Sequence, residues 1–141
     1  MKKPVETARR WLAQAEHSLS ATQALLESGF WAEACFHAEQ TAHLALKAFL
    51  YARGTRFINI HSIRELAVAC SKEDPDFSTF VDAGTSLDRY YLATRYPDVL
   101  PAPAVPFESF AQPEAHRALT FATEIVGSVR AKLSASLSGS S

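Results

Sequence analysis

The sequence contains few cysteines, and their spacing excludes two common kinds of site. Only Cys35 and Cys70 occur among 141 residues, so no C-x-x-C pair for zinc binding or thiol redox chemistry exists. Cys35 lies in an apolar run, which favours a small core residue over a reactive thiol. This cysteine usage suits a reducing compartment, and we expect a cytoplasmic protein.

The sequence also lacks a long apolar run and an excess of charge of either sign. Gln40, His43 and Lys47 interrupt the longest apolar stretch, and a polar helix pattern follows the first residues. We therefore expect neither a membrane span nor a secretory signal. The formal net charge of −1 argues against a strongly basic nucleic-acid coat.

The signatures of common enzyme classes are absent as well. The sequence has no P-loop, no G-x-G-x-x-G, no G-x-S-x-G and no H-E-x-x-H. His37 and His43 are six residues apart, which is too far round a helix for the paired ligands of a zinc face. We expect no metal and no cofactor, and the balance favours a protein without intrinsic enzymatic activity.

Apolar residues recur at helical spacing along most of the chain, and no strand-like alternation appears. The pattern predicts helices over residues 5–28, 31–53, 62–71, 74–95 and 113–133. Gly29 and Gly54 are expected to end the first two helices, and Ser62 to Glu65 form a capping box for the third. Five helices with mostly short connections predict an all-α fold, an antiparallel five-helix bundle with an up-and-down arrangement.

The chain length fits one domain, which we place at residues 1–133. Residues 134–141 are rich in Ser and Gly and are expected to form a flexible tail. Residues 96–112 contain four prolines and are predicted to form a stiff, extended loop. This loop is long for a compact domain, so we expect it to be functional or mobile.

Two groups of polar residues are candidates for a site. The first is a polar stripe along the otherwise apolar second helix, and it must face water, a subunit interface or a ligand cleft, because unpartnered buried polar groups are costly. Its members are Glu33, His37, Gln40, His43 and Lys47.

The second group lies at the end of the predicted fourth helix. Asp88 and Arg95 would share one face of that helix. The planar guanidinium of Arg95 suits bidentate phosphate binding, and Tyr96 could stack on a base. An Asp–Arg pair tying the helix end to its neighbour is the structural alternative.

A third observation is local charge. The segment from Gln40 to Arg64 contains bases and no acid, so it either attracts phosphate or forms a solvated loop. The bases are Lys47, Arg53, Arg56 and Arg64.

Segments in order along the chain resemble the HEPN domain family. Residues 36–50 (FHAEQTAHLALKAFL) resemble its second-helix pattern, residues 61–66 (HSIREL) its H-S-L-x-x-L segment, and residues 94–98 (TRYPD) its R-Y-P-D segment. Trp11 and residues 25–31 resemble its first helix and turn, so the resemblance covers about residues 9–132. The sequence departs from the family pattern at His43 and Leu44, where Glu and Lys are usual.

The resemblance implies a five-helix bundle that is commonly dimeric and often encoded beside a minimal nucleotidyltransferase, in a module resembling a toxin–antitoxin system. Some members bind nucleotides. Others are metal-independent ribonucleases that use an R-x4-6-H motif at a dimer cleft. The family's polar residues fall here on Gln40, Lys47, His61, Arg95 and Asp98.

The ribonuclease spacing occurs twice, in Arg56 with His61 and in Arg10 with His17. Chemically, a His could act as general base on a ribose 2′-hydroxyl while an Arg stabilises the phosphate charge. The active family motif usually has a polar residue after the Arg, whereas Phe57 follows Arg56 here.

Three hypotheses follow. The first is a homodimeric module that binds nucleotide or RNA and works with a nucleotidyltransferase partner. The second is a metal-independent endoribonuclease toxin, with Arg56 and His61 as catalytic candidates. The third is a structural dimerisation module without a ligand. The candidate ligand-binding residues are Gln40, Lys47, His61, Asp88, Arg95, Tyr96 and Asp98.

Overall fold

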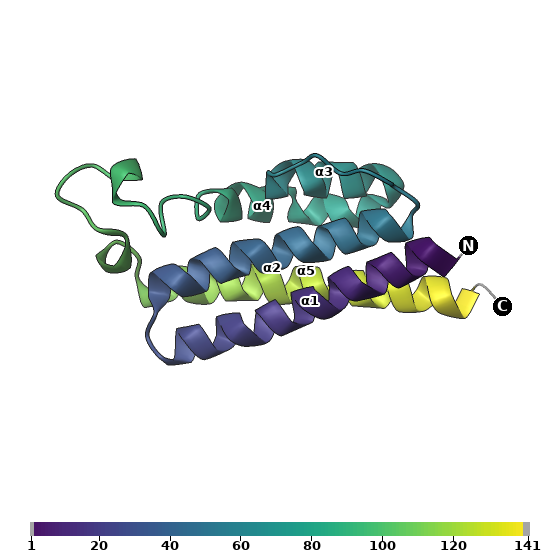
Figure 1. The fold of residues 1–141 in the computed structure, drawn as a ribbon, viewed down its shortest axis with the longest axis horizontal. Helices are drawn as coiled ribbons and strands as arrows, with labels where there is room; N and C mark the ends of the chain where they lie inside the picture. Colours follow the sequence, from purple (N-terminus) through teal and green to yellow (C-terminus); the bar gives the residue numbers. More distant parts are fainter. Residues whose placement is uncertain (1, 140–141) are drawn as a thin grey trace.

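The computed structural model describes residues 2–139 and the side chains of residues 3–135. Over this range the chain forms five α-helices and no strand (Figure 1). The helices are α1 (Lys2–Glu27), α2 (Trp31–Ala52), α3 (Ile63–Glu73), α4 (Val81–Asp88) and α5 (Gln112–Gly139), and the 3-10 turns are η1 (Pro75–Phe80), η2 (Pro97–Val99) and η3 (Pro106–Glu108). The all-α, five-helix prediction is confirmed.

The three long helices α1, α2 and α5 lie side by side, and the short helices α3 and α4 cover the other side of α2 (Figure 1). α2 is the central helix, because it packs against all four of the others. This position explains why its sequence is apolar on almost every side. The start of α1 and the end of α5 lie at the same end of the bundle (Figure 1).

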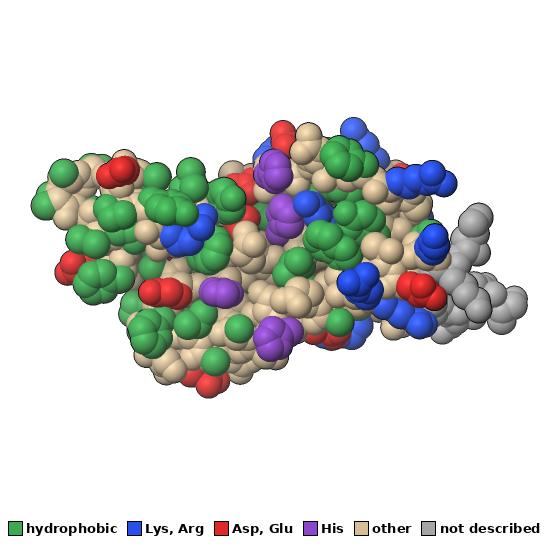
Figure 2. All heavy atoms as spheres, in the orientation of Figure 1, with side chains coloured by type: hydrophobic (Ala, Val, Ile, Leu, Met, Phe, Trp, Pro, Cys, Tyr) green, Lys and Arg blue, Asp and Glu red, His purple; other side chains and the backbone are tan. Residues whose placement is uncertain are grey.

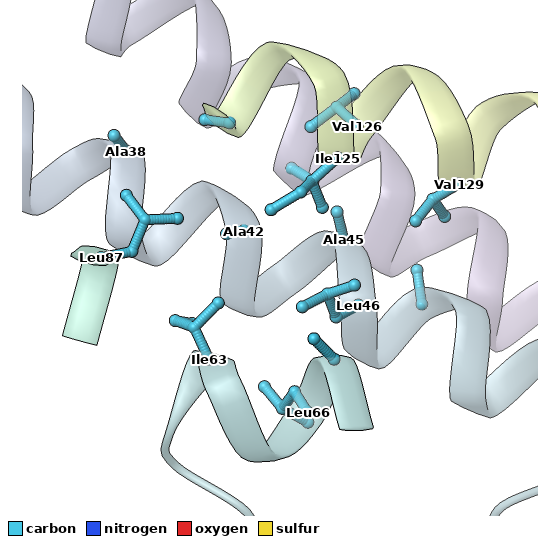
Figure 3. Close-up of a cluster of buried hydrophobic side chains, with 14 of the residues drawn as sticks. Ala38, Ala42, Ala45, Leu46, Ile63, Leu66, Leu87, Ile125, Val126 and Val129 are labelled. Atoms are coloured by element: carbon cyan, nitrogen blue, oxygen red, sulfur yellow. The ribbon is translucent and has the colours of Figure 1, made fainter. Parts of the chain in front are cut away.

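The core is built on small residues of α2. Ala38, Ala42 and Ala45 are fully buried, and their short side chains let neighbouring helices approach closely (Figure 3). Larger side chains fill the space between the helices, and they come from α2, α3, α4 and α5: Leu46, Ile63, Leu66, Leu87, Ile125, Val126 and Val129 (Figure 3).

Cys35 and Cys70 also belong to this core, which confirms the interpretation of Cys35 as a core residue. Burial raises the pKa of both thiols to about 12. They are therefore protonated and unreactive at neutral pH.

The ends of the first helices follow the sequence signals. Gly29 and Gly54 have φ values of 83° and 92°, and each lies two residues after the last residue of a helix, where the sequence predicts the helix to end. The Ser62 hydroxyl accepts a hydrogen bond from the Glu65 N–H at 3.1 Å, which is the N-cap half of the predicted capping box.

The prediction of one continuous fourth helix over residues 74–95 is wrong. This segment is η1, then α4, then a series of turns up to Arg95. The helix stops after Asp88 because the next residues make tertiary contacts. Tyr90 is buried, its hydroxyl donates to Glu114 at 2.9 Å, and its ring packs against Phe110.

The proline-rich segment also differs from the expected pattern. Residues 96–111 form an arm that projects beyond the bundle and contains η2 and η3, so the proline-rich loop is not entirely extended (Figure 1). The flexible tail predicted from Ser134 overlaps the end of α5, which continues to Gly139. Residues 140 and 141 lie outside the described residues.

Candidate functional site

Asp88 lies at the junction of α3 and α4, and its carboxylate is bound to the first turn of α3. It accepts hydrogen bonds from the Ser62 hydroxyl at 2.7 Å and from the backbone N–H groups of Ile63 and Arg64. These N–H groups have no partner inside the helix, and a carboxylate also suits the positive end of the helix dipole. Asp88 therefore holds α3 against α4.

Gly84, one turn before Asp88, makes this contact possible. A Cβ atom at this position would lie 2.6 Å from the backbone nitrogen of Arg64. Only a glycine lets the two backbones approach so closely. The close approach brings the Asp88 carboxylate within hydrogen-bond distance of α3.

Glu39 is a residue of α2, next to the polar stripe, and its carboxyl group is buried. Glu39 is only 2% exposed and accepts a hydrogen bond from Gln40 Nε2 at 2.7 Å. Burial is the main reason why the pKa of Glu39 is raised to about 7, and the nearby negative charge of Asp88 raises it further. Arg95 and the hydrogen bond from Gln40 act in the opposite direction. Because this pKa is close to 7, a large fraction of Glu39 is neutral near pH 7.

His43 is half-buried in the middle of the stripe, close to Lys47, His61 and Asp88. Burial, followed by the charges of Lys47 and His61, lowers the pKa of His43 to about 4. The ring is therefore neutral at physiological pH. Its Nδ1 atom is buried and has no hydrogen-bond partner.

Lys47, at the far end of the stripe, is 8% exposed, and burial lowers its pKa. Its ammonium nitrogen lies 5.7 Å from the ring centre of Trp11 in α1. None of the ion pairs among the described residues involves Lys47. The face of α2 thus ends at a largely buried cation beside an aromatic ring.

Arg95 lies at the other end of this face, in an aromatic cage that we define as Phe36, Tyr91 and Tyr96. The guanidinium carbon lies 4.2 Å, 5.0 Å and 4.8 Å from the three ring centres, in that order. Nε and Nη2 donate to the carbonyl oxygen of Tyr91, and Nη1 donates to the Tyr96 hydroxyl at 3.3 Å. Contacts of this kind fix the orientation of a guanidinium group.

The structure thus brings together different candidate residues from those that the sequence pattern predicts to lie together. Asp88 and Arg95 do not share a helical face, because α4 ends at Asp88. No ion pair joins them among the described residues, so the structural alternative of an Asp–Arg pair is not observed there. Asp98 lies in η2 and is exposed. Gln40 and His61 lie near Glu39 and His43, respectively.

The candidate ribonuclease residues have different surroundings. Arg56 lines a depression between the start of α1 and the end of α2, together with Lys3 and Tyr51, and His61 does not line it. Arg10 and His17 both line a second depression, which includes Trp11. Within the described residues, no group of three His, Cys, Asp or Glu side chains is arranged to hold a metal ion.

The bases between Gln40 and Arg64 do not form one patch. Arg53 lies over the Phe49 ring and 3.9 Å from Asp74, and Arg64 donates to Thr85. Arg53 and Arg64 are therefore used for local contacts, and of these bases only Lys47 belongs to the polar stripe of α2. Figure 2 shows several histidine side chains on this face, with a Lys or Arg side chain beside them.

Sequence reasoning missed three residues of this surface. Glu39 had a detectable signal, since a carboxylate on the buried side of an apolar helix needs an explanation. Phe36 and Trp11 had no such signal, because an aromatic residue at helical spacing is usually a core residue. Their cation contacts depend on how distant segments pack together.

In residues 2–139, no helix combines the length and apolar character that crossing a membrane requires. No curated protein matches the sequence significantly. The profile of the HEPN domain family matches residues 8–132.

Solved structures agree with this match. TT1696 from Thermus thermophilus is 42% identical, with a TM-score of 0.80, and the alignment covers 89% of this chain and 97% of that one. ST0689, an archaeal HEPN homologue, is 28% identical with a TM-score of 0.73 and coverage of 89% and 97%. A HEPN domain protein from Thermotoga maritima, tm0613, is 25% identical with a TM-score of 0.69 and coverage of 89% and 98%. The chain therefore belongs to the HEPN domain family.

Proposed function

We propose that this HEPN-domain protein binds nucleotide or RNA on the face of α2, without catalysing a reaction of its own. The observation that carries the proposal is the caged guanidinium of Arg95. Three aromatic rings hold it, and it makes three hydrogen bonds within the chain. A guanidinium group has five N–H donors, so donor capacity remains for a phosphate.

The cage also offers surface for a base. Tyr91 and Tyr96 are 49% and 48% exposed, and so their rings are accessible at the surface. Bases stack on such rings and on guanidinium planes, and this stacking tolerates any base. A positioned Arg beside exposed aromatic rings is therefore suited to a ligand that carries both a base and a phosphate.

Several features favour binding over ribonuclease activity. Arg56 and His61 match the ribonuclease spacing but do not line a common depression. The neutral His43 could accept a proton, but it lies beside Lys47 and has no Arg from the motif as partner. An RNA cleavage assay tests the alternative, since cleavage that persists with chelator and disappears in His61→Ala would establish the endoribonuclease.

We also propose a cytoplasmic homodimer that acts with a minimal nucleotidyltransferase partner in a toxin–antitoxin-like module, as is common for HEPN proteins. Exposed apolar residues of the arm, such as Val99 and Phe107, offer a surface for protein contacts. Light scattering at micromolar concentration tests the dimer. If the protein is instead a purely structural dimerisation module, it will dimerise and bind no nucleotide.

The deciding experiment is calorimetric titration with ATP, GTP and a short single-stranded RNA. We expect saturable binding to the wild type and at least tenfold weaker binding to Arg95→Ala, because base stacking and charged hydrogen bonds each contribute about 1–3 kcal/mol. Arg117→Ala, which removes an exposed arginine of α5, is the matched control and should bind normally. If the wild type binds none of the ligands, the proposed function is wrong.

A further inference from the structure

The face of α2 has two ends that are both suited to nucleic acid, and they lie far apart. Phe36 contacts Arg95 at one end, and Lys47 lies beside Trp11 at the other. A helix rises 1.5 Å per residue, so the eleven residues from Phe36 to Lys47 span about 16 Å. Each end pairs a cation with an aromatic ring, which is the combination found in grooves that bind single strands.

The far end is a cation without an acidic partner. Lys47 is 8% exposed and takes part in none of the ion pairs among the described residues. A desolvated ammonium group without a counter-charge is costly unless an anion binds to it. A phosphate at this position would supply the missing charge.

Additional polar groups surround this end. Trp11 also lines a shallow depression with Arg10, His17 and Leu44, so basic and aromatic side chains continue from α2 onto α1. His61 lies close to His43. Figure 2 shows a Lys or Arg side chain beside the histidines of this face, with acidic side chains close to them.

The acidic groups between the two ends do not block an anion. Glu39 is 2% exposed, and burial raises its pKa to about 7, which makes the carboxyl largely neutral below that pH. Asp88 is half-buried, and its carboxylate oxygens accept three hydrogen bonds at the start of α3. Their negative charge is thus weakened or compensated.

We infer that the ligand of this surface is a single-stranded polynucleotide, which places a base at the Arg95 cage and a phosphate at Lys47. This inference rests on the proposed function and specifies its ligand class. One nucleoside monophosphate is too short to reach both ends. Gln40 and His43 lie between them and would face the intervening nucleotides.

A length series of ligands tests the inference. The probes are AMP, ATP, and single-stranded RNAs of two, four and eight nucleotides, with an eight-nucleotide DNA of the same sequence as a further arm. Affinity of the wild type should rise at least tenfold between AMP and the four-nucleotide RNA, and then level off. Preference for RNA over DNA would indicate contacts to the 2′-hydroxyl, and equal binding would indicate contacts to bases and phosphates, both within the inference.

A substitution at Lys47, with a matched control, tests the far end of the face separately from the Arg95 cage. Lys47→Met keeps the length and apolar stem of the side chain and removes only the charge, and Lys72→Met, at an exposed lysine of α3, is its control. Lys47→Met should weaken binding of the eight-nucleotide RNA at least tenfold, and should weaken RNA binding much more than AMP binding. It should also reduce the slope of log K against log salt by about 0.7, as expected for the loss of one phosphate contact to a single strand. Circular dichroism checks that the variant is folded.

The results distinguish the inference from the proposed function. If ATP binds as tightly as the eight-nucleotide RNA, or if Lys47→Met behaves like Lys72→Met, the polynucleotide is excluded and nucleotide binding at Arg95 stands. If no probe binds the folded wild type, both are wrong. If affinity rises with the length of the RNA and Lys47→Met abolishes this rise, the result supports both the proposed function and the inference.

Discussion

Asp88 and Arg95 are only seven residues apart, yet their charges are satisfied in different ways. The Asp88 carboxylate is held by a hydroxyl and two backbone N–H groups at the start of α3. The Arg95 guanidinium is held mainly by aromatic rings and by one carbonyl oxygen of its own turn. Asp88 connects two helices, whereas Arg95 connects no other helix by a hydrogen bond among the described residues.

The difference indicates which charge supports the fold and which is available to a ligand. A carboxylate that accepts hydrogen bonds from several backbone N–H groups has little capacity to accept more from a ligand. Its removal leaves those N–H donors unpartnered. Aromatic rings orient a guanidinium group without occupying all of its N–H donors. We therefore assign a structural role to Asp88, although the sequence pattern predicts a ligand-binding one, and keep Arg95 as the ligand-binding candidate.

The largest expected effect is that of Asp88→Ala on stability. The substitution leaves the first turn of α3 without its acceptor, and we expect the free energy of unfolding to fall by about 3 kcal/mol. Urea denaturation followed by circular dichroism measures this. Arg95→Ala is the comparison, and a loss as large as that of Asp88→Ala would contradict the division of roles.

The next largest expected effect concerns Glu39, whose pKa is affected by both Asp88 and Arg95. Its pKa rises from 4.5 to about 7 on folding, so the folded state keeps a proton that the unfolded state releases. The stability of the wild type therefore declines as pH rises from 4.5 to 7. Glu39→Gln has no such proton, and we expect its stability relative to the wild type to increase by about 3 kcal/mol between pH 4 and pH 8.

Unfolding curves of both proteins at several pH values provide this test. His43 has a lowered pKa and contributes the opposite trend, because its stability contribution is lost as pH falls below 6.5. It is present in both proteins, so its effect largely cancels from the difference. A difference that does not change with pH would show that Glu39 is not desolvated.

A smaller loss of stability is expected for Gly84→Ala. The new methyl group would collide with the backbone of Arg64, and overpacking of this kind costs about 1–3 kcal/mol. The better helix propensity of alanine offsets about 1 kcal/mol of that cost. Gly127→Ala in α5 is a control with open space, and it should not be destabilised. Thermal denaturation of the two variants gives the comparison.

The smallest expected effects are shifts in the pKa of Glu39 when Arg95 or Asp88 is replaced. Arg95 lowers the pKa of Glu39 and Asp88 raises it. Arg95→Ala should therefore raise this pKa and Asp88→Asn should lower it, which carboxyl NMR titration can measure. Arg95→Ala should cost less than about 1 kcal/mol of stability, as expected for an exposed side chain. Shifts in the same direction in both variants would contradict the arrangement.

Much of the fold is predictable because its signals are local. Apolar spacing defines α1, α2 and α5, and Gly29, Gly54 and Ser62 mark helix ends through their own backbone conformation or hydroxyl group. The segment after Asp88 was not predictable in this way. Its apolar residues fit a helix, but the contacts of Tyr90 with Glu114 and Phe110 come from a distant part of the chain.

The site was predictable only in part, for the same reason. The polar stripe of α2 and the Arg95–Tyr96 pair are visible as residues, because polar side chains on an apolar helix stand out. The contacts that these residues make with distant parts of the chain are not visible in the sequence. The cage needs Phe36 of α2 beside a turn almost sixty residues later, and Lys47 needs Trp11 of α1. No local pattern encodes such pairs.

The sequence by itself determined α1, α2, α3 and α5 and the family, since these depend on periodicity and on short motifs. The tertiary structure decided what the polar groups do. Packing of α4 on α3 through Gly84 commits Asp88 to the fold, and burial of Glu39 of α2 among its neighbours makes this carboxyl group hard to ionise. The physical reason is that a polar side chain is defined by its partners and its exposure to water, and both come from distant segments.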